Sequence, residues 1–326
     1  MPPELRDAAA PGSYPGHMTP EVTRDHIVAA AGRIEGHVRR TPLIELGDSF
    51  GNGYRLSLKL DSLQRTGSFK IRGAFSLLTA VEIPESGVVA ASGGNFGLAV
   101  ACAARDLGHR ATIFVPDTSP QEKIGRISGY EADIRLVPGF YPEALEAAKV
   151  WAAESGAFQA HAYDQPEVVA GQGTCGREIL DDCPNVDTVL VAVGGGGLIA
   201  GVSSWIRDDA RVVAVEPELC PTLFEARRAG RPVEVELGGI AASSLAASPI
   251  GDHCWQANRW IDDSALVTDA QIVDAQRWLW NECRVVAEPG AATTVAALMV
   301  GAYVPLRAEH IVAVISGANT DPASVV

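Results

Sequence analysis

The sequence predicts an α/β protein built from parallel sheets that carry helices on both faces. Segments typical of strands and of helices alternate along most of the 326 residues, as they do in βαβ units. Two strands, Thr188–Val193 and Ile311–Ile315, are almost wholly apolar, which is typical of strands buried on both faces. With 47% hydrophobic residues, the chain can form a core large enough for two domains or lobes.

The first half of the chain begins with a helix and then alternates. Glu21–Arg40 carries apolar residues at helical spacing, and an extended segment starts at Thr41–Ile44. Tyr54–Leu60 alternates apolar and polar residues, which predicts a half-buried strand. Further strands are predicted at Gly87–Ala91, Ala111–Pro116, Asp133–Val137 and Phe158–Ala160, and helices at Arg72–Leu78, Asn95–Leu107, Gln121–Tyr130 and Pro142–Gly156.

The second half follows the same alternation. Besides the two apolar strands, a third such strand is predicted at Arg211–Glu216, whereas Pro232–Arg259 is weakly patterned and rich in loops. The predicted helices are Pro166–Asp182, Leu198–Ile206, Leu223–Gly230, Asp269–Glu282 and Gly290–Val300.

Composition narrows the class of protein. The formal net charge of −14 disfavours nucleic acid and anionic membranes as partners, and no apolar run is long enough to span a bilayer. Residues 1–18 lack the basic and apolar regions of a signal peptide, and their Pro, Gly and Ala content suggests a flexible arm. The six cysteines are scattered without a metal-finger spacing, so we expect reduced thiols in a cytoplasmic protein.

Lys70 is the first candidate for chemistry. It follows Gly67-Ser68-Phe69, where Gly67 and Ser68 predict a turn and a helix cap, so Lys70 would lie in the first turn of a helix. The positive end of the helix dipole disfavours an ammonium group there. A lysine held partly neutral is a nucleophile that can form a Schiff base with a carbonyl, although a lone lysine is usually an ordinary solvated side chain.

Two glycine-containing loops could bind anions. Gly194, Gly195, Gly196 and Gly197 join a buried strand to a helix, and backbone amides together with a helix N-terminus favour a phosphate. Four successive glycines exceed what a tight turn needs, and no nucleotide fingerprint surrounds them. Ser92–Gly97 has the same strand–loop–helix setting, where capping of the helix and binding of a carboxylate are equally plausible readings.

These residues resemble a known family. Gly-Ser-Phe-Lys-Ile-Arg-Gly-Ala around Lys70 is similar to the cofactor-lysine motif of fold-type II pyridoxal-phosphate enzymes, and the serine/threonine dehydratases and serine racemases are the nearest branch. Three further stretches are similar to that family's motifs, in its order and at its spacing: Ser92–Gly97, Gly194–Gly197 and Ser316–Asn319. The resemblance implies two lobes, with a small lobe at 81–160 inserted in a large lobe formed by 1–80 and 161–326. We also expect a homodimer.

The resemblance also implies roles for single residues. Lys70 would hold pyridoxal 5'-phosphate, and the four glycines would bind its phosphate. Asn95 would donate to the phenolic oxygen of the cofactor, while Ser92, Gly93 and Asn95 would bind the substrate carboxylate. Ser316 would face the pyridine nitrogen, where a neutral hydroxyl favours elimination over transamination. Glu288, in Glu288-Pro289, is a further candidate near the active site.

The sequence departs from the family pattern at several positions. Phe96 replaces the usual His, and Gly93 replaces the serine that serves racemases as a second acid/base, which argues against racemisation. Glu216-Pro217 resembles the start of a divalent-cation site, but Thr222 stands where an acid is expected, so we expect no strong metal site. Because the sequence ends at Val326, we expect no regulatory domain of the kind found in biosynthetic threonine dehydratases.

The expected activity is β-elimination from a small 3-hydroxy amino acid. L-Threonine or L-serine would lose its α-proton to Lys70 and then its β-hydroxyl, and hydrolysis would give a 2-oxo acid and ammonia. The alternatives are β-replacement as in cysteine-synthase-like enzymes, a different 3-hydroxy substrate, which Phe96 suggests, and a non-catalytic protein that binds the cofactor.

Overall fold

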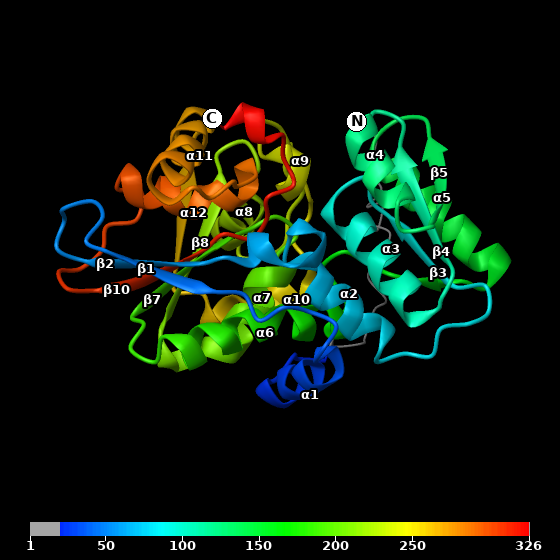
Figure 1. Ribbon diagram of the computed structural model, residues 1–326, viewed down its shortest axis with the longest axis horizontal. Helices are drawn as coiled ribbons and strands as arrows, with labels where there is room; N and C mark the ends of the chain where they lie inside the picture. The colour runs from blue at the N-terminus through cyan, green and yellow to red at the C-terminus, as the bar shows by residue number, and fades with distance from the viewer. Residues whose placement is uncertain (1–19, 326) are drawn as a thin grey trace, which may run out of the picture.

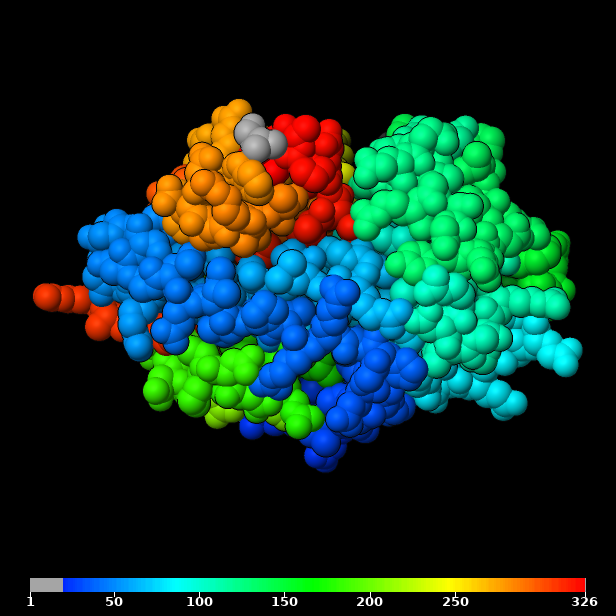
Figure 2. Space-filling model, in the orientation of Figure 1, coloured from blue at the N-terminus to red at the C-terminus, as the bar shows by residue number. Residues whose placement is uncertain are grey.

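The computed structural model describes residues 20–325 and has an α/β architecture with two separate sheets, one of six strands and one of four. Figure 1 shows each sheet with its own helices, so the molecule has two lobes that lie side by side. In the space-filling view, a narrow furrow separates the surface of the C-terminal residues, in red, from the smaller lobe, in green (Figure 2). The N-terminal arm expected at residues 1–18 lies outside the described residues.

The six-stranded sheet has the order β1-β2-β10-β7-β8-β9 and is parallel except for the β1–β2 pair. At its centre Val312 of β10 pairs with Val189 of β7 and with Ser57 of β2. Because β10 and β7 run in the same direction, the segments that begin at Gly194 and Ser316 leave the same edge of the sheet. The strands are β1 Leu43–Gly47, β2 Arg55–Lys59, β7 Thr188–Ala192, β8 Arg211–Pro217, β9 Asp263–Val267 and β10 His310–Val314.

The four-stranded sheet is parallel throughout and has the order β5-β4-β3-β6. Val88 of β3 pairs with Ala111 of β4 on one side and with Phe158 of β6 on the other. The strands are β3 Val88–Ala91, β4 Ala111–Pro116, β5 Asp133–Val137 and β6 Phe158–Gln159, so this sheet comes from one continuous stretch of chain.

Helices cover both faces of both sheets, as the alternating pattern predicted. Apolar side chains of α1, α6, α7, α8 and α10 form the core on one face of the six-stranded sheet, and those of α9, α11 and α12 form the core on the other. On the four-stranded sheet α3 and α4 form the core on one face and α5 on the other, and α2 packs against α3 and α6 (Figure 1). The helices are α1 Arg24–Ile34, α2 Lys70–Leu78, α3 Asn95–Leu107, α4 Gln121–Ser128, α5 Tyr141–Ser155, α6 Pro166–Asp182, α7 Gly197–Ile206, α8 Thr222–Ala229, α9 Ala242–Leu245, α10 Asp252–Ala257, α11 Asp269–Cys283 and α12 Pro289–Met299.

Four local predictions were wrong. The first helix ends at Ile34, because Glu35 has an extended ψ of 132° and Gly36 adopts a positive φ of +78°. The strand predicted as half-buried, β2, is buried on both faces because it lies between β1 and β10. Strand β9 was not predicted, since it is a short edge strand with few buried side chains. Ser68 does not cap α2: its hydroxyl has no hydrogen-bond partner, and Phe69 is the cap residue.

Two expectations about the whole chain can be compared with the structure. Within residues 20–325, no helix combines the length and the apolar character needed to cross a bilayer. The six cysteines form no disulfide, five of them are buried, and Cys283 is half-buried, as expected for unpaired thiols.

Candidate functional site

Lys70 lies at the start of α2, in a cavity of about 370 Å³ between the two lobes. The cavity is lined by residues from both lobes, which include Lys70, Ser92, Gly93, Asn95, Phe96, Ser119, Tyr163 and Gly195. The structure therefore brings the lysine, residues of the Ser92–Gly97 loop and one of the four glycines to the same cavity.

The backbone before Lys70 is held by the C-terminal end of the large sheet. Gly67 has φ +76°, and a Cβ there would lie 2.5 Å from Oδ1 of Asn319, so the turn requires glycine. The amide of Phe69 donates to the carbonyl of Ser316 at 2.9 Å. These contacts fix where α2 begins and therefore where the Lys70 side chain enters the cavity.

The environment of Lys70 favours the neutral amine. Burial lowers the pKa of Lys70 to about 8, and the Glu288 carboxylate opposes this shift only in part. The position at the first turn of α2 acts in the same direction. Nζ donates to the carbonyl of Ala162 at 2.8 Å and lies 5.0 Å from the ring centre of Phe69. Lys70 is therefore poised for nucleophilic chemistry at a moderately alkaline pH.

The four glycines form a close-packed loop at the N-terminus of α7. Gly196 has φ +89°, which side chains rarely adopt, and a Cβ there would lie 2.3 Å from Sγ of Cys254. A Cβ on Gly195 would lie 2.4 Å from the ring of Tyr163. The loop therefore excludes side chains at these positions, and backbone amides at a helix N-terminus suit an anion.

Asn95 and Glu288 form a buried polar cluster beside the lysine. Nδ2 of Asn95 donates to Oε1 and Oε2 of Glu288 at 2.8 and 3.1 Å, and Oδ1 of Asn95 accepts from Nδ2 of Asn319 at 2.6 Å. Burial raises the pKa of Glu288 to about 7, although the hydrogen bond from Asn95 opposes this. The carboxyl group can thus gain or lose a proton near neutral pH.

Ser316 follows β10 at the carboxyl edge of the large sheet and is buried. Next to it, Gly317 leaves no room for a side chain, because a Cβ would lie 2.2 Å from Oε1 of Glu288. The backbone of Ser316 is joined to the residue before Lys70, and Gly317 is packed against Glu288. The fourth predicted motif therefore lies in the same region as the other three.

Comparison with known proteins identifies the family. A family model described as "Pyridoxal-phosphate dependent enzyme" matches residues 34–317. The chain belongs to this family. The L-threonine ammonia-lyase of Thermotoga maritima is 36% identical over 307 residues, which cover 92% of this chain and 76% of that protein. A catabolic L-threonine dehydratase of Staphylococcus aureus is 35% identical over 92% of this chain and 90% of its own length. Maize serine racemase has a TM-score of 0.88 and 31% identity, and the match covers 93% of this chain and 95% of that one.

The cavity fits the cofactor of this family. Pyridoxal phosphate carries an aldehyde and a phosphate, so it needs a nucleophilic lysine and an anion site. Lys70, with its lowered pKa, supplies the first of these. The close-packed glycines, one of which lines the same cavity, supply the second.

The Glu216 region is arranged differently from a metal site. Both carboxylate oxygens of Glu216 accept backbone amides at the start of α8, from Leu223 and Phe224, each at 2.7 Å. Thr222 donates its hydroxyl to the carbonyl of Ala247. Within residues 20–325, no group of three His, Cys, Asp or Glu side chains is placed to hold a metal ion. The expectation that the protein has no strong metal site stays a prediction.

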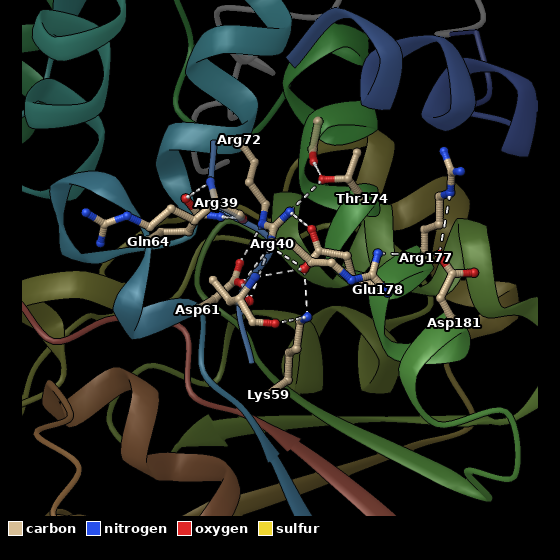
Figure 3. Close-up of polar contacts among 12 residues, drawn as sticks. Arg39, Arg40, Lys59, Asp61, Gln64, Arg72, Thr174, Arg177, Glu178 and Asp181 are labelled. Carbon is tan, nitrogen blue, oxygen red and sulfur yellow. Dashed lines mark hydrogen bonds and ion pairs between the residues drawn. The ribbon is translucent and has the colours of Figure 1, made fainter. Parts of the chain in front are cut away.

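A buried network of charges surrounds Arg72 on α2, two residues after Lys70, and none of its members was predicted to have a role. The guanidinium of Arg72 makes bidentate contacts with Asp61 at 2.8 Å and with Glu178 at 2.7 and 2.9 Å, and Nζ of Lys59 lies 2.7 Å from Glu178 (Figure 3). Burial alone would raise the pKa of Asp61, but Arg72 overcomes this and holds it below its usual range. The network joins β2, α2 and α6, and so fixes the position of α2. Charged residues within otherwise buried segments were the signal that could have revealed it.

Proposed function

We propose that the protein is an ammonia-lyase that uses pyridoxal phosphate to remove the β-hydroxyl from a small 3-hydroxy amino acid, L-threonine or L-serine. The products are a 2-oxo acid and ammonia. The observation that supports this best is a half-buried lysine with a lowered pKa in a cavity that is also lined by Gly195 of the glycine loop. The L-threonine ammonia-lyase and dehydratase relatives support the reaction class.

Each predicted site residue has a role in this proposal. Lys70 holds the cofactor and takes the α-proton once the substrate has replaced it. The amides of Gly194–Gly197, with the N-terminus of α7, bind the phosphate. Ser92, Gly93 and Asn95 bind the substrate carboxylate, and Asn95 also donates to the phenolic oxygen. When bound, the cofactor withdraws electrons from the α-carbon and so makes the α-proton acidic.

Ser316 and Glu288 determine the kind of chemistry in the proposal. Ser316 would offer the pyridine nitrogen of the cofactor a neutral hydroxyl instead of the carboxylate of an aspartate. A neutral donor at this position would favour elimination over transamination. Glu288 can exchange a proton near neutral pH beside Asn95, and in the proposal it gives this proton to the leaving hydroxyl.

We also propose how the chain is divided into lobes, how the enzyme assembles and where in the cell it is located. Residues 81–160 form the small lobe, inserted in a large lobe of residues 1–80 and 161–326, and the enzyme is a cytoplasmic homodimer. Its partner is the small amino acid, not nucleic acid or membrane, in keeping with the net charge of −14.

The test is product analysis with purified holoenzyme on a panel of 3-hydroxy amino acids, with and without an added thiol. The proposal predicts equal amounts of 2-oxo acid and ammonia, unaffected by the thiol. Consumption of thiol with formation of a substituted amino acid would instead indicate β-replacement. A holoenzyme that carries the cofactor but converts no member of the panel would indicate a binding protein.

A further inference from the structure

The space above Gly93 is filled by a hydroxyl from another loop. A Cβ on Gly93 would lie 2.2 Å from Oγ of Ser119, 3.0 Å from its Cβ and 3.1 Å from Cγ1 of Val115. The backbone of Gly93 does not have a positive φ, so its conformation alone would admit a side chain. What the position lacks is room, and Ser119 occupies that room.

The hydroxyl of Ser119 is available to a ligand. Ser119 lies in the turn between β4 and α4, where its amide donates to the carbonyl of Pro116 at 3.0 Å. The residue lines the cavity that contains Lys70, and its Oγ makes no hydrogen bond to any residue within 20–325. Helix α4 is capped by Pro120 without a side-chain hydrogen bond, so Ser119 is not used as a helix cap.

The surroundings of Ser119 favour an anion. The N-terminus of α3, which follows Gly94, and that of α4, which follows Pro120, both border the cavity. Both helix ends carry partial positive charge, and Lys123 in the first turn of α4 also lines the cavity. A hydroxyl between two such helix ends and near a cation is suited to donate to a carboxylate.

We propose that Ser119 is a substrate-binding residue, which donates a hydrogen bond to the α-carboxylate of the amino acid above Gly93. This inference rests on the proposed function, because it assumes that an amino acid occupies the cavity beside Lys70. It adds a contact from the β4–α4 turn to those of the Ser92–Gly97 loop. It also explains why position 93 is glycine: the hydroxyl comes from residue 119 instead.

The test measures binding, not turnover, with L-alanine, which has no β-leaving group. Titration calorimetry on the holoenzyme compares L-alanine with L-alaninamide, which lacks the carboxylate. Ser119→Ala is expected to weaken L-alanine binding about tenfold or more and to leave L-alaninamide binding unchanged, since a hydrogen bond to a charged group is lost. Ser243→Ala is the matched control, because Ser243 lines the same cavity but already donates its hydroxyl to the carbonyl of Ile240.

Three outcomes would overturn the proposal: equal L-alanine affinity in Ser119→Ala, an equal loss for both ligands, or no binding of L-alanine by the unmodified holoenzyme. Ser119-dependent binding without any elimination activity would contradict the proposed function and leave this inference intact.

A second pair of variants tests the packing alone in the apoprotein. Gly93→Ala should lower the melting temperature, and the added Ser119→Gly should recover most of the loss. If Gly93→Ala lowered the melting temperature equally with and without Ser119→Gly, this would contradict the claim that Ser119 fills the space above Gly93.

Discussion

The side-chain amide of Asn95 donates to the buried carboxylate of Glu288, with 2.8 Å between Nδ2 and Oε1. Asn95 begins α3, which packs in the smaller lobe, and Glu288 immediately precedes α12 on the large sheet. Asn319 donates to Asn95 from the segment after β10. Three segments that lie far apart in the sequence therefore meet beside Lys70, and the two lobes are joined by hydrogen bonds at the cavity.

The raised pKa of Glu288 predicts how apoprotein stability changes with pH. The folded state binds this proton more tightly than the unfolded state, because the folded pKa is about 7 and the ordinary value is 4.5. The stabilisation is therefore fully present below pH 4.5 and is lost as the pH rises through 7. Glu288→Gln removes this contribution, so urea unfolding between pH 5 and 7.5 should give a flatter profile than the wild type. Part of the slope should remain, since burial also raises the pKa of Glu216 to about 7.

The control for this measurement is Glu282→Gln, at the exposed end of α11. It should keep the wild-type slope. An unchanged slope in Glu288→Gln would contradict the claim that the folded state raises the pKa of this carboxyl group.

The lowered pKa of Lys70 predicts the pH dependence of cofactor attachment. Only the neutral amine attacks an aldehyde, so the rate of attachment to apoprotein should rise with pH and level off above about 8. Stopped-flow absorbance follows the reaction through the visible band of the imine between the lysine and the cofactor. Lys70→Ala should show no such band. A rate that keeps climbing to pH 10 would mean that Lys70 is an ordinary solvated lysine.

The glycine loop predicts a loss of cofactor affinity when a side chain is added. Gly196→Ala should weaken pyridoxal phosphate binding about tenfold or more, because alanine at φ +89° is strained and its Cβ meets Sγ of Cys254. Gly125→Ala is the control: it lies within α4 with open space around it, so it should bind normally. Equilibrium titration of the apoproteins measures both. Equal affinities in the two variants would argue that the phosphate binds elsewhere.

The charge network predicts a large stability effect from a residue outside the cavity. Arg72→Met leaves Asp61 and Glu178 without their guanidinium partner, so the free energy of unfolding should fall by about 3–5 kcal/mol. Arg72→Lys should recover only part of this, because an ammonium cannot make two bidentate contacts. Arg177→Met is the control, since Arg177 is partly exposed on α6 and lies 3.9 Å from Asp181. Denaturant unfolding that gives Arg72→Met and Arg177→Met the same stability would contradict this account.

The alternation of strands and helices was sufficient to predict most of the fold. Helices such as Asn95–Leu107 and Pro166–Asp182 have the predicted bounds, because long apolar periodic segments carry a strong local signal. Strand β9 was missed because an edge strand with few buried residues carries only a weak sequence signal. Ser68 was predicted to cap a helix from its residue type alone, but its backbone bridges to Gly317 and the cap position falls on Phe69, one residue later.

The candidate site was only partly predictable. Lys70 and the glycines could be found because each motif is continuous in the sequence. Ser119 above Gly93, Tyr163 against Gly195, and the Arg72 network depend on contacts between separate elements, which no local pattern encodes. Phe96 was noted as a departure, and it lines the cavity with its ring centre 5.8 Å from Nζ of Lys70.

The central claim is that Lys70 carries the cofactor. Borohydride reduction of the holoenzyme, followed by peptide mapping with mass spectrometry, tests this most directly because reduction makes the link permanent. The account predicts a single pyridoxyl adduct on Lys70, and neither adduct nor turnover in Lys70→Ala. An adduct on Lys59, Lys123 or Lys149 instead would contradict it.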